Sequence, residues 1–419
     1  MTGKRYALPQ DDPIIVIRKR YVILSKAKDL IPAQYFKILR RLCLLLVAGI
    51  VTGCGGGGEE TSEADDVIKI GVFEPLTGAN AAGGELEKEG IELANKLYPE
   101  VLGKKVELVV VDNKSDKAEA ASAAARLIEK DNVCAIIGSW GSAFSISAGN
   151  IIKENEVPCV GASCTNPLVT QGNDWYFRVC FIDPFQGKVM ARYAYNNLGA
   201  KKAAIIQEVS NDYAVGLASF FKEEFTKLTG DPNAVVEVSN YQTNDTDFTA
   251  QLGNVKAKNP DVIFAPGNFT ESALIIKQGR QLGIDVPFIG GDTWEVQEFL
   301  SVGGEQVEGA VFSTFFDPSY TFTPESEKFL EAFKEEYPDR EPAAVTALGY
   351  DAYILILDAI ERAGSADPAA IRDALAETKG FEGAAGVITL DENGDAVKDA
   401  VIKTVKDGKF VFMDVVKAD

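Results

Sequence analysis

The feature that most constrains the fold is a regular alternation of short β-branched apolar runs with amphipathic stretches, beginning at Val67. The first runs are VIKIGVFE, VELVVVDN, VCAIIGS and VPCVGA, and the helical patterns between them lie near residues 85–98, 116–130 and 142–154. Strands and helices that alternate in this way form parallel sheets with helices on both faces. The sequence therefore predicts an α/β protein.

A second series of the same kind follows the first. Its apolar runs are AAIIQE, AVVEVSNY, VIFAPG and PFIGGD, and its helical patterns lie near residues 185–198, 213–229, 248–258, 271–282 and 294–301. The chain thus predicts two doubly wound parallel-sheet lobes. After a strand at 311–316, helical patterns near 324–336, 343–363 and 368–377 run without strands between them, and 400–405 and 409–416 are typical of a hairpin. This tail is too small for a third domain, so we expect it to complete the two lobes.

The segment ahead of the lobes has the pattern of a secretion signal. Basic residues at 37, 40 and 41 precede an apolar run from Leu42 to Val51, which is too short to span a membrane, since a spanning helix needs about 20 residues. A basic stretch followed by a short apolar run and small residues is typical of a signal peptide. The run ends in Val-Thr-Gly-Cys at Cys54, which resembles the lipobox of bacterial lipoproteins, whose cysteine receives lipid.

We therefore expect residues 1–53 to be a leader, with the true start near residue 36, so that 1–36 would lie ahead of it. Residues 54–66 are expected to form a flexible tether, because the glycine run Gly55–Gly58 and the acidic residues after it behave as flexible coil. The alternative is a buried strand ending in an ordinary cysteine. It is disfavoured because glycines and acids cannot pack behind such a strand. The expected location is the extracytoplasmic face of a membrane, held by a lipid anchor at Cys54.

Composition excludes several classes of function. The chain has 62 Asp and Glu against 42 Lys and Arg, a net charge of −20, which opposes binding to nucleic-acid phosphates. It has no histidine, which removes imidazole bases, Ser-His-Asp triads and histidine metal sites. No Cys-x-x-Cys pair or phosphate-binding P-loop motif occurs either. We therefore expect no enzyme activity, no metal, no cofactor and no nucleic-acid partner.

Four cysteines remain once the leader and the lipid site are set aside: Cys134, Cys159, Cys164 and Cys180. The simplest interpretation makes them small buried core residues. An oxidising compartment would also permit disulfides, and four cysteines allow three pairings, between which the sequence does not choose.

Polar residues follow the strand ends, where ligands bind on open α/β sheets. Ser142 opens the helix after VCAIIG, and Thr165 follows VPCVGA. A helix N-terminus with hydroxyls beside it suits a carboxylate. Asp292 follows PFIGGD and could pair with an ammonium. Each of these residues could instead be only a cap or a turn, and Tyr213 could be only packing. Together they predict a zwitterion held between two lobes that close on it.

The sequence resembles the type I periplasmic solute-binding proteins, specifically the leucine/isoleucine/valine-binding family of ABC importers, from residue 67 to 419. The segments that carry the resemblance are IGVFEPLTGANAAGGELEKEGIELA, IIGSWGSAFSISA, VPCVGASCTNPLVT, FRVCFIDPFQG, NDYAVGL and FIGGDTW. It implies three crossovers between the lobes, near residues 185, 314 and 388. Lobe 1 would then comprise 67–184 and 315–388, and lobe 2 would comprise 185–314 and 389–419.

The resemblance also implies roles for individual residues. Ser142 and Thr165 match positions that hold the ligand carboxylate, whereas the Ser163 carbonyl and Asp292 match positions that hold its ammonium. Tyr213 matches an aromatic residue that covers the ligand. The remaining candidates are Trp140 and Asn268, expected at the side-chain pocket. The implied partners are an ABC permease and its ATPase, on separate chains.

Two departures from the family bear on specificity. Gly83 and Asn268 stand where a branched-chain binder has tyrosines. Loss of a ring is expected to enlarge the pocket, and Asn268 to add polarity, so the ligand could be a larger or more polar amino acid, or another small carboxylate or amide. The favoured function is capture of an amino acid for an ABC importer. The alternatives are a sensing receptor for amides or aromatic carboxylates and, less favoured, an enzyme on a flavodoxin-like scaffold.

Overall fold

The computed structural model describes residues 67–418 of the chain. The expected leader 1–53, the tether 54–66 and the lipidation site Cys54 lie outside the described residues. Within 67–418, no helix combines the length and the apolar character that a membrane span requires.

The first lobe is built on a six-stranded sheet in the order β2-β3-β1-β4-β5-β6. The strands are β1 (Val67–Glu74), β2 (Glu100–Val101), β3 (Lys104–Asp112), β4 (Ala135–Ile137), β5 (Cys159–Gly161) and β6 (Tyr176–Arg178). All neighbouring strands are parallel except the β2–β3 pair. β1 is buried along most of its length, as its continuous β-branched run predicts for a central parallel strand.

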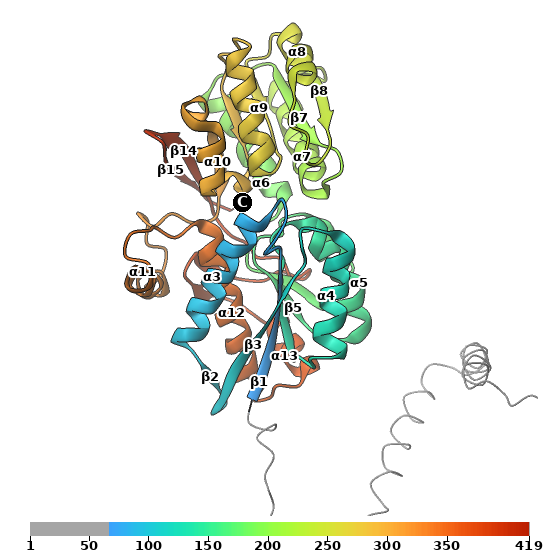
Figure 1. Ribbon diagram of the computed structural model, residues 1–419, viewed down its shortest axis with the longest axis vertical. Coiled ribbons are helices and arrows are strands. Elements are labelled where there is room, and N and C mark those ends of the chain that lie inside the picture. Colours follow the sequence, from blue (N-terminus) through green and yellow to red (C-terminus); the bar gives the residue numbers. More distant parts are fainter. Residues whose placement is uncertain (1–66, 419) are drawn as a thin grey trace, which may run out of the picture. The chain divides into compact units, whose positions relative to one another are not determined.

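Helices cover both faces of this sheet (Figure 1). One face carries α4 (Lys117–Glu129) and α5 (Ser142–Asn155) over a core that includes Phe73 and Leu127. The other carries α3 (Ala81–Leu97) and α12 (Ala344–Ala363). The α3 and α12 backbones approach closely, since a side chain on Gly90 or Gly349 would collide with the backbone of the opposite helix. The chain on either side of α12 also contains two further helices, α11 (Pro324–Glu336) and α13 (Pro368–Ala376), and a short pair of strands, β12 (Phe381–Gly383) and β13 (Gly386–Ile388).

The second lobe is built on a seven-stranded sheet in the order β15-β14-β11-β10-β9-β7-β8. Its parallel strands are β7 (Ala203–Glu208), β8 (Val235–Tyr241), β9 (Val262–Phe264), β10 (Phe288–Gly290) and β11 (Val311–Thr314), and the hairpin β14 (Ala400–Lys406) and β15 (Lys409–Val416) adds an antiparallel edge. Its helices are α6 (Asp183–Arg192), α7 (Asp212–Thr229), α8 (Thr249–Lys258), α9 (Phe269–Gln281) and α10 (Gln297–Gly303). The two doubly wound lobes predicted from the sequence are therefore confirmed.

Three crossovers join the lobes. The chain leaves the first sheet after Arg178 and enters α6, returns between β11 and α11, and crosses again between β13 and β14. Phe181 and Phe315, from the first two crossovers, pack with ring centroids 4.4 Å apart and ring planes tilted by 37°. Because the chain changes lobe at these three places, we propose lobe boundaries at 184/185, 314/315 and 388/389.

Some local features differ from the sequence-based expectation. β6 (Tyr176–Arg178) was not predicted, because Arg178 interrupts the apolar stretch in which it lies. The helix expected over 294–301 begins at Gln297, after a 3₁₀ turn, η4 (Asp292–Trp294). Cys134, Cys159, Cys164 and Cys180 are free thiols, all buried except the half-buried Cys134. Burial raises the pKa of the Cys164 thiol to about 11, so these thiols are packing residues rather than reactive ones.

Candidate functional site

A cavity of about 420 Å³ lies between the two lobes. Its walls are the loops after β1, β3, β4 and β5 of the first sheet and after β7, β8, β9 and β10 of the second. All of these loops follow the carboxyl ends of parallel strands, where open α/β sheets bind ligands. The volume is in the range of small-molecule sites.

One wall of the cavity is the N-terminus of α5. The residue ahead of this helix, Gly141, has φ 90°, and no side chain caps the helix. Its first N–H groups, and the positive end of its dipole, are therefore available to an anion. The Ser142 hydroxyl also lines the cavity and accepts a hydrogen bond from Asn166 N at 3.1 Å, which leaves its own hydrogen to donate.

The loop after β5 carries the next two predicted residues, Ser163 and Thr165, and only Ser163 reaches the cavity. Ser163 lines the cavity, and its hydroxyl donates to the Glu87 carboxyl on α3. Thr165 is fully buried but does not line the cavity, and its Oγ1 has no hydrogen-bond partner in the described residues. Its carbonyl accepts from Asp183 N at 2.9 Å. The direct ligand contact expected of Thr165 remains a prediction, and the structure places this residue behind the cavity wall.

The second lobe contributes a buried acid to the cavity, Asp292. Its Oδ1 accepts hydrogen bonds from Gln186 Nε2 at 2.7 Å and from Tyr213 OH at 3.0 Å. Burial raises the pKa of Asp292 to about 6, and the two hydrogen bonds oppose that shift. No described cation forms an ion pair with Asp292, so a ligand cation would find the carboxylate unpaired.

Three further buried carboxyl groups surround this region. Burial raises the pKa of Glu87 and of Asp183 to about 8, and it also raises that of Glu74, which is hydrogen-bonded to Glu87. Glu74 Oε2 in turn accepts from Trp140 N at 2.6 Å. Burial thus favours the neutral form of the acids around Asp292, and Asp292 itself is the carboxylate that a positive ligand group would meet.

Trp140 lines the cavity and packs on a glycine. A Cβ on Gly83 would collide with the Trp140 indole. The expectation that loss of a ring at Gly83 enlarges the pocket is therefore wrong at this position, because the indole fills the space. Trp140 also contacts Phe269 of the other lobe edge to face, with centroids 6.1 Å apart.

Tyr213 and Asn268 both line the cavity, as do two asparagines that were not predicted, Asn80 and Asn211. Asn268 Nδ2 donates to Asn80 Oδ1 at 3.0 Å across the lobes, and Asn211 Nδ2 lies 3.4 Å from Asn268 Oδ1. Sequence reasoning had a signal for both missed residues, because each lies in the loop that follows a recognised strand.

Further contacts join the lobes beside the cavity. Lys117 Nζ on α4 forms an ion pair with Asp212 Oδ2 at the start of α7, 2.8 Å away. Asn166 Nδ2 donates to the Asp212 carbonyl at 2.8 Å. A side chain on Gly216 of α7 would collide with Asn166. The structure therefore has the two lobes in direct contact around the site.

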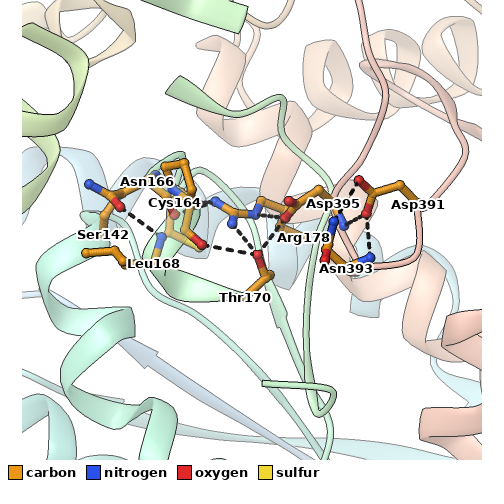
Figure 2. A network of polar contacts seen from close by, with 10 residues as sticks. Ser142, Cys164, Asn166, Leu168, Thr170, Arg178, Asp391, Asn393 and Asp395 are labelled. Atoms are coloured by element: carbon orange, nitrogen blue, oxygen red, sulfur yellow. Dashed lines mark hydrogen bonds and ion pairs between the residues drawn. The ribbon is translucent and has the colours of Figure 1, made fainter. Parts of the chain in front are cut away.

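The loop that carries Ser163 and Thr165 is fixed from behind by Arg178 (Figure 2). The guanidinium donates to the carbonyls of Cys164 at 2.5 Å and Asn166 at 2.9 Å. On its other side it reaches Asp395 in the third crossover and Thr170 Oγ1, each at 2.6 Å. Arg178 is fully buried. Burial lowers the pKa of the guanidinium, but the Asp395 carboxylate beside it opposes that shift and the pKa lies above its usual value.

Asp391, Asn393 and Asp395 have the spacing of the first ligands of a calcium-binding EF-hand loop, but this segment forms a different turn. Asp391 Oδ1 accepts the backbone N–H groups of Asn393 at 2.8 Å and Asp395 at 2.9 Å, so its carboxylate closes the turn (Figure 2). Within residues 67–418, no cluster of three or more acids or cysteines is arranged to hold a metal ion.

A family model, curated relatives and solved structures all relate this chain to periplasmic or amino-acid binding proteins. The family model described as periplasmic binding protein matches residues 67–409. Leu/Ile/Val-binding protein homolog 3 of Brucella melitensis is 30% identical over 84% of this chain and 94% of its own length. The crystal structure of a leucine binding protein, LivK, from Thermotoga maritima has a TM-score of 0.80 at 47% identity, over 84% of this chain and 99% of that one.

Two other solved structures extend the comparison to bound ligands. The branched-chain amino acid transporter substrate binding protein LivJ of Streptococcus pneumoniae, in complex with isoleucine, has a TM-score of 0.78 at 34% identity, over 84% and 99% of the two chains. A solute binding protein of an ABC transporter from Rhodopseudomonas palustris, in complex with 3,4-dihydroxy benzoic acid, has a TM-score of 0.75 at 25% identity, over 84% and 98%. The chain therefore belongs to the periplasmic binding proteins, as a type I solute-binding protein of the Leu/Ile/Val-binding family of ABC transporters.

Proposed function

We propose that the protein captures an α-amino acid between its two lobes and delivers it to an ABC permease. One observation carries the proposal: a single cavity joins an uncapped helix N-terminus with a serine hydroxyl on one lobe to the buried acid Asp292 on the other. The first group suits a carboxylate and the second an ammonium. A free amino acid carries both charges on one carbon, so it bridges the lobes only when they close.

In this proposal each end of the ligand has defined partners. The α5 N–H groups and the Ser142 hydroxyl receive the carboxylate, while Thr165 supports that loop or approaches the ligand after a small shift. Asp292 and the Ser163 carbonyl receive the ammonium, and Tyr213 covers the ligand while it donates to Asp292. Closure then depends on ligand, because binding energy from the second lobe is gained only in the closed state.

The proposed setting is the extracytoplasmic face of a membrane. The family is one of periplasmic solute-binding proteins, which supports that location and a role without catalysis. We propose that lipid on Cys54 holds the protein there through the tether 54–66. The permease and ATPase would be separate chains that receive the loaded, closed form.

The test is a thermal-shift screen of the purified protein against the twenty amino acids, simple amides and aromatic acids. A compound that binds only the folded state must raise the unfolding midpoint, by an amount that grows with concentration. We expect at least one α-amino acid to do so, and its N-acetyl and methyl-ester derivatives, each lacking one charge, to fail. If no amino acid shifts the midpoint while another class does, the proposal is overturned.

A second candidate ligand class is the aromatic carboxylates. It is favoured by the Trp140 and Phe144 rings in the cavity wall and by the ligand named in the Rhodopseudomonas palustris structure. An aromatic acid would use the α5 end alone and leave the buried Asp292 carboxylate without a cationic partner. The same screen separates the two classes, since benzoate and hydroxybenzoates shift the midpoint only in the second case.

A further inference from the structure

Part of the cavity wall has no role in holding the two charged ends of an amino acid. It contains three asparagines, Asn80 from the first lobe and Asn211 and Asn268 from the second. Asn80 and Asn268 are both buried, with exposed fractions of 7% and 6%. If an amino acid occupies the cavity as proposed above, this wall is left to contact its side chain.

The hydrogen bonds among these side chains fix the direction in which each amide is oriented. Asn268 donates to Asn80 Oδ1 at 3.0 Å, and Asn211 Nδ2 lies 3.4 Å from Asn268 Oδ1. Asn211 Oδ1 accepts from Tyr213 N at 3.1 Å. The three amide oxygens therefore already have donors. What the wall still offers is N–H groups, above all Asn80 Nδ2, for which the described residues provide no hydrogen-bond acceptor.

An aliphatic side chain would bury the N–H groups of Asn80 Nδ2 without an acceptor, which is more costly than the hydrogen bond itself is favourable. A side chain with an oxygen acceptor would satisfy them. A site built around such donors discriminates strongly against the isostere that lacks the polar group.

Charge at the same wall disfavours an anionic acceptor. Glu208 lines the cavity, is buried, and is held by Asn211 Nδ2 at 3.0 Å and by the Thr243 hydroxyl. The exposed Asp116 lines the cavity too, and the lining cation Lys117 is already paired with Asp212. A negative side chain would meet carboxylates with no free cation among the described lining residues.

We propose that the ligand is an α-amino acid whose side chain carries a neutral hydrogen-bond acceptor, a carboxamide or hydroxyl oxygen, received by the amide groups of Asn80 and Asn268. The inference rests on the proposed function and narrows its substrate class. Trp140, packed between Gly83 and Phe269, lines the same cavity as this amide pair.

The test compares amino acids of matched shape by isothermal titration at neutral pH. Asparagine, leucine and aspartate form one set, and threonine and valine form the other. We expect asparagine to bind at least about tenfold more tightly than leucine and aspartate, and threonine to exceed valine by a similar factor. The inference is overturned if leucine and valine bind as tightly as their polar partners, or if none of asparagine, glutamine, serine, threonine and tyrosine binds.

These outcomes separate this inference from the proposed function. Tight binding of leucine, or of another amino acid whose side chain lacks a carboxamide or hydroxyl oxygen, overturns the polar specificity but leaves amino-acid capture standing. Failure of every amino acid in the thermal-shift screen overturns both.

Variants assign the preference to the amide pair. Asn268→Leu keeps the shape of the side chain and removes its hydrogen bonds, so the ratio of asparagine to leucine affinity should fall by about tenfold or more. Asn80→Leu should act in the same direction. Asn254→Leu, on the exposed side of α8, is the matched control and should leave the ratio unchanged. Because each result is a ratio measured on one preparation, partial unfolding cannot imitate it, and an unchanged ratio in Asn268→Leu would refute the assignment.

Discussion

Arg178 Nε lies 2.6 Å from Asp395 Oδ1, and both side chains are buried, with exposed fractions of 0% and 9%. The pair ties the end of β6 to the third crossover, more than two hundred positions later in the chain (Figure 2). The same guanidinium holds the carbonyls on both sides of Thr165. The ligand-binding loop of the first lobe and one of the connections between the lobes therefore share a single buried cation.

Arg178→Gln should destabilise the protein strongly. It leaves Asp395 buried without its cation and removes the donors to two carbonyl groups, for which we expect a loss of about 3–5 kcal/mol in the free energy of unfolding. The measurement is urea unfolding followed by fluorescence. The control is Arg126→Gln, which removes an exposed ion pair with Asp131 and should cost less than about 1 kcal/mol. Equal losses in the two variants would show that the buried pair contributes no more than a surface one.

Gly83→Ala should be harmful although alanine favours helices. The new methyl group would collide with the Trp140 indole, which is 2% exposed and packed on Phe269. Overpacking of this kind costs about 1–3 kcal/mol, and displacement of Trp140 should also weaken ligand binding. Gly253→Ala makes the same change on α8 with nothing within 4 Å of the new atom and should stabilise by up to about 1 kcal/mol. The measurement is the thermal unfolding midpoint of both variants. An unchanged midpoint in Gly83→Ala would mean that the Trp140 indole can move aside without cost.

Ligand affinity should fall as the pH falls through 6. Burial raises the pKa of Asp292 to about 6 in the ligand-free protein, so below that pH the carboxyl holds a proton and must release it to pair with an ammonium. Affinity should be full above about pH 7 and decrease about tenfold for each unit below 6. Titration calorimetry at several pH values measures this. Asp292→Asn should bind weakly at all of them, and a flat profile in the unchanged protein would exclude Asp292 as the ammonium partner.

Cys54→Ala should release the protein from membranes. If a lipid on this cysteine is the anchor, its loss removes the attachment to the bilayer, so the variant should move to the soluble fraction. Fractionation of cells producing either form is the measurement, and mass spectrometry of the membrane form should show the lipid mass. Unchanged membrane association of Cys54→Ala would refute lipidation at that residue.

Part of the candidate site could be predicted because parallel strands bring their carboxyl ends to one edge. Ser142, Ser163, Tyr213 and Asp292 follow four such strands, and all of them line the cavity. Thr165 was expected at the wall for the same reason but lies behind it. The residues that follow a strand can be located from the sequence, but the direction of their side chains depends on packing with elements far away in the chain.

The sequence alone determined the alternation of strands and helices, and with it the two lobes, because hydrophobic periodicity is a local property of the chain. Only the tertiary structure decided which residues contact one another around the cavity. Gly83 and Trp140 are separated by more than fifty residues, and Asn80 and Asn268 by more than one hundred and eighty. No local pattern encodes that an indole fills the space left by a glycine, or that two amides face each other across the lobes, because both contacts arise only when the sheets and crossovers have assembled.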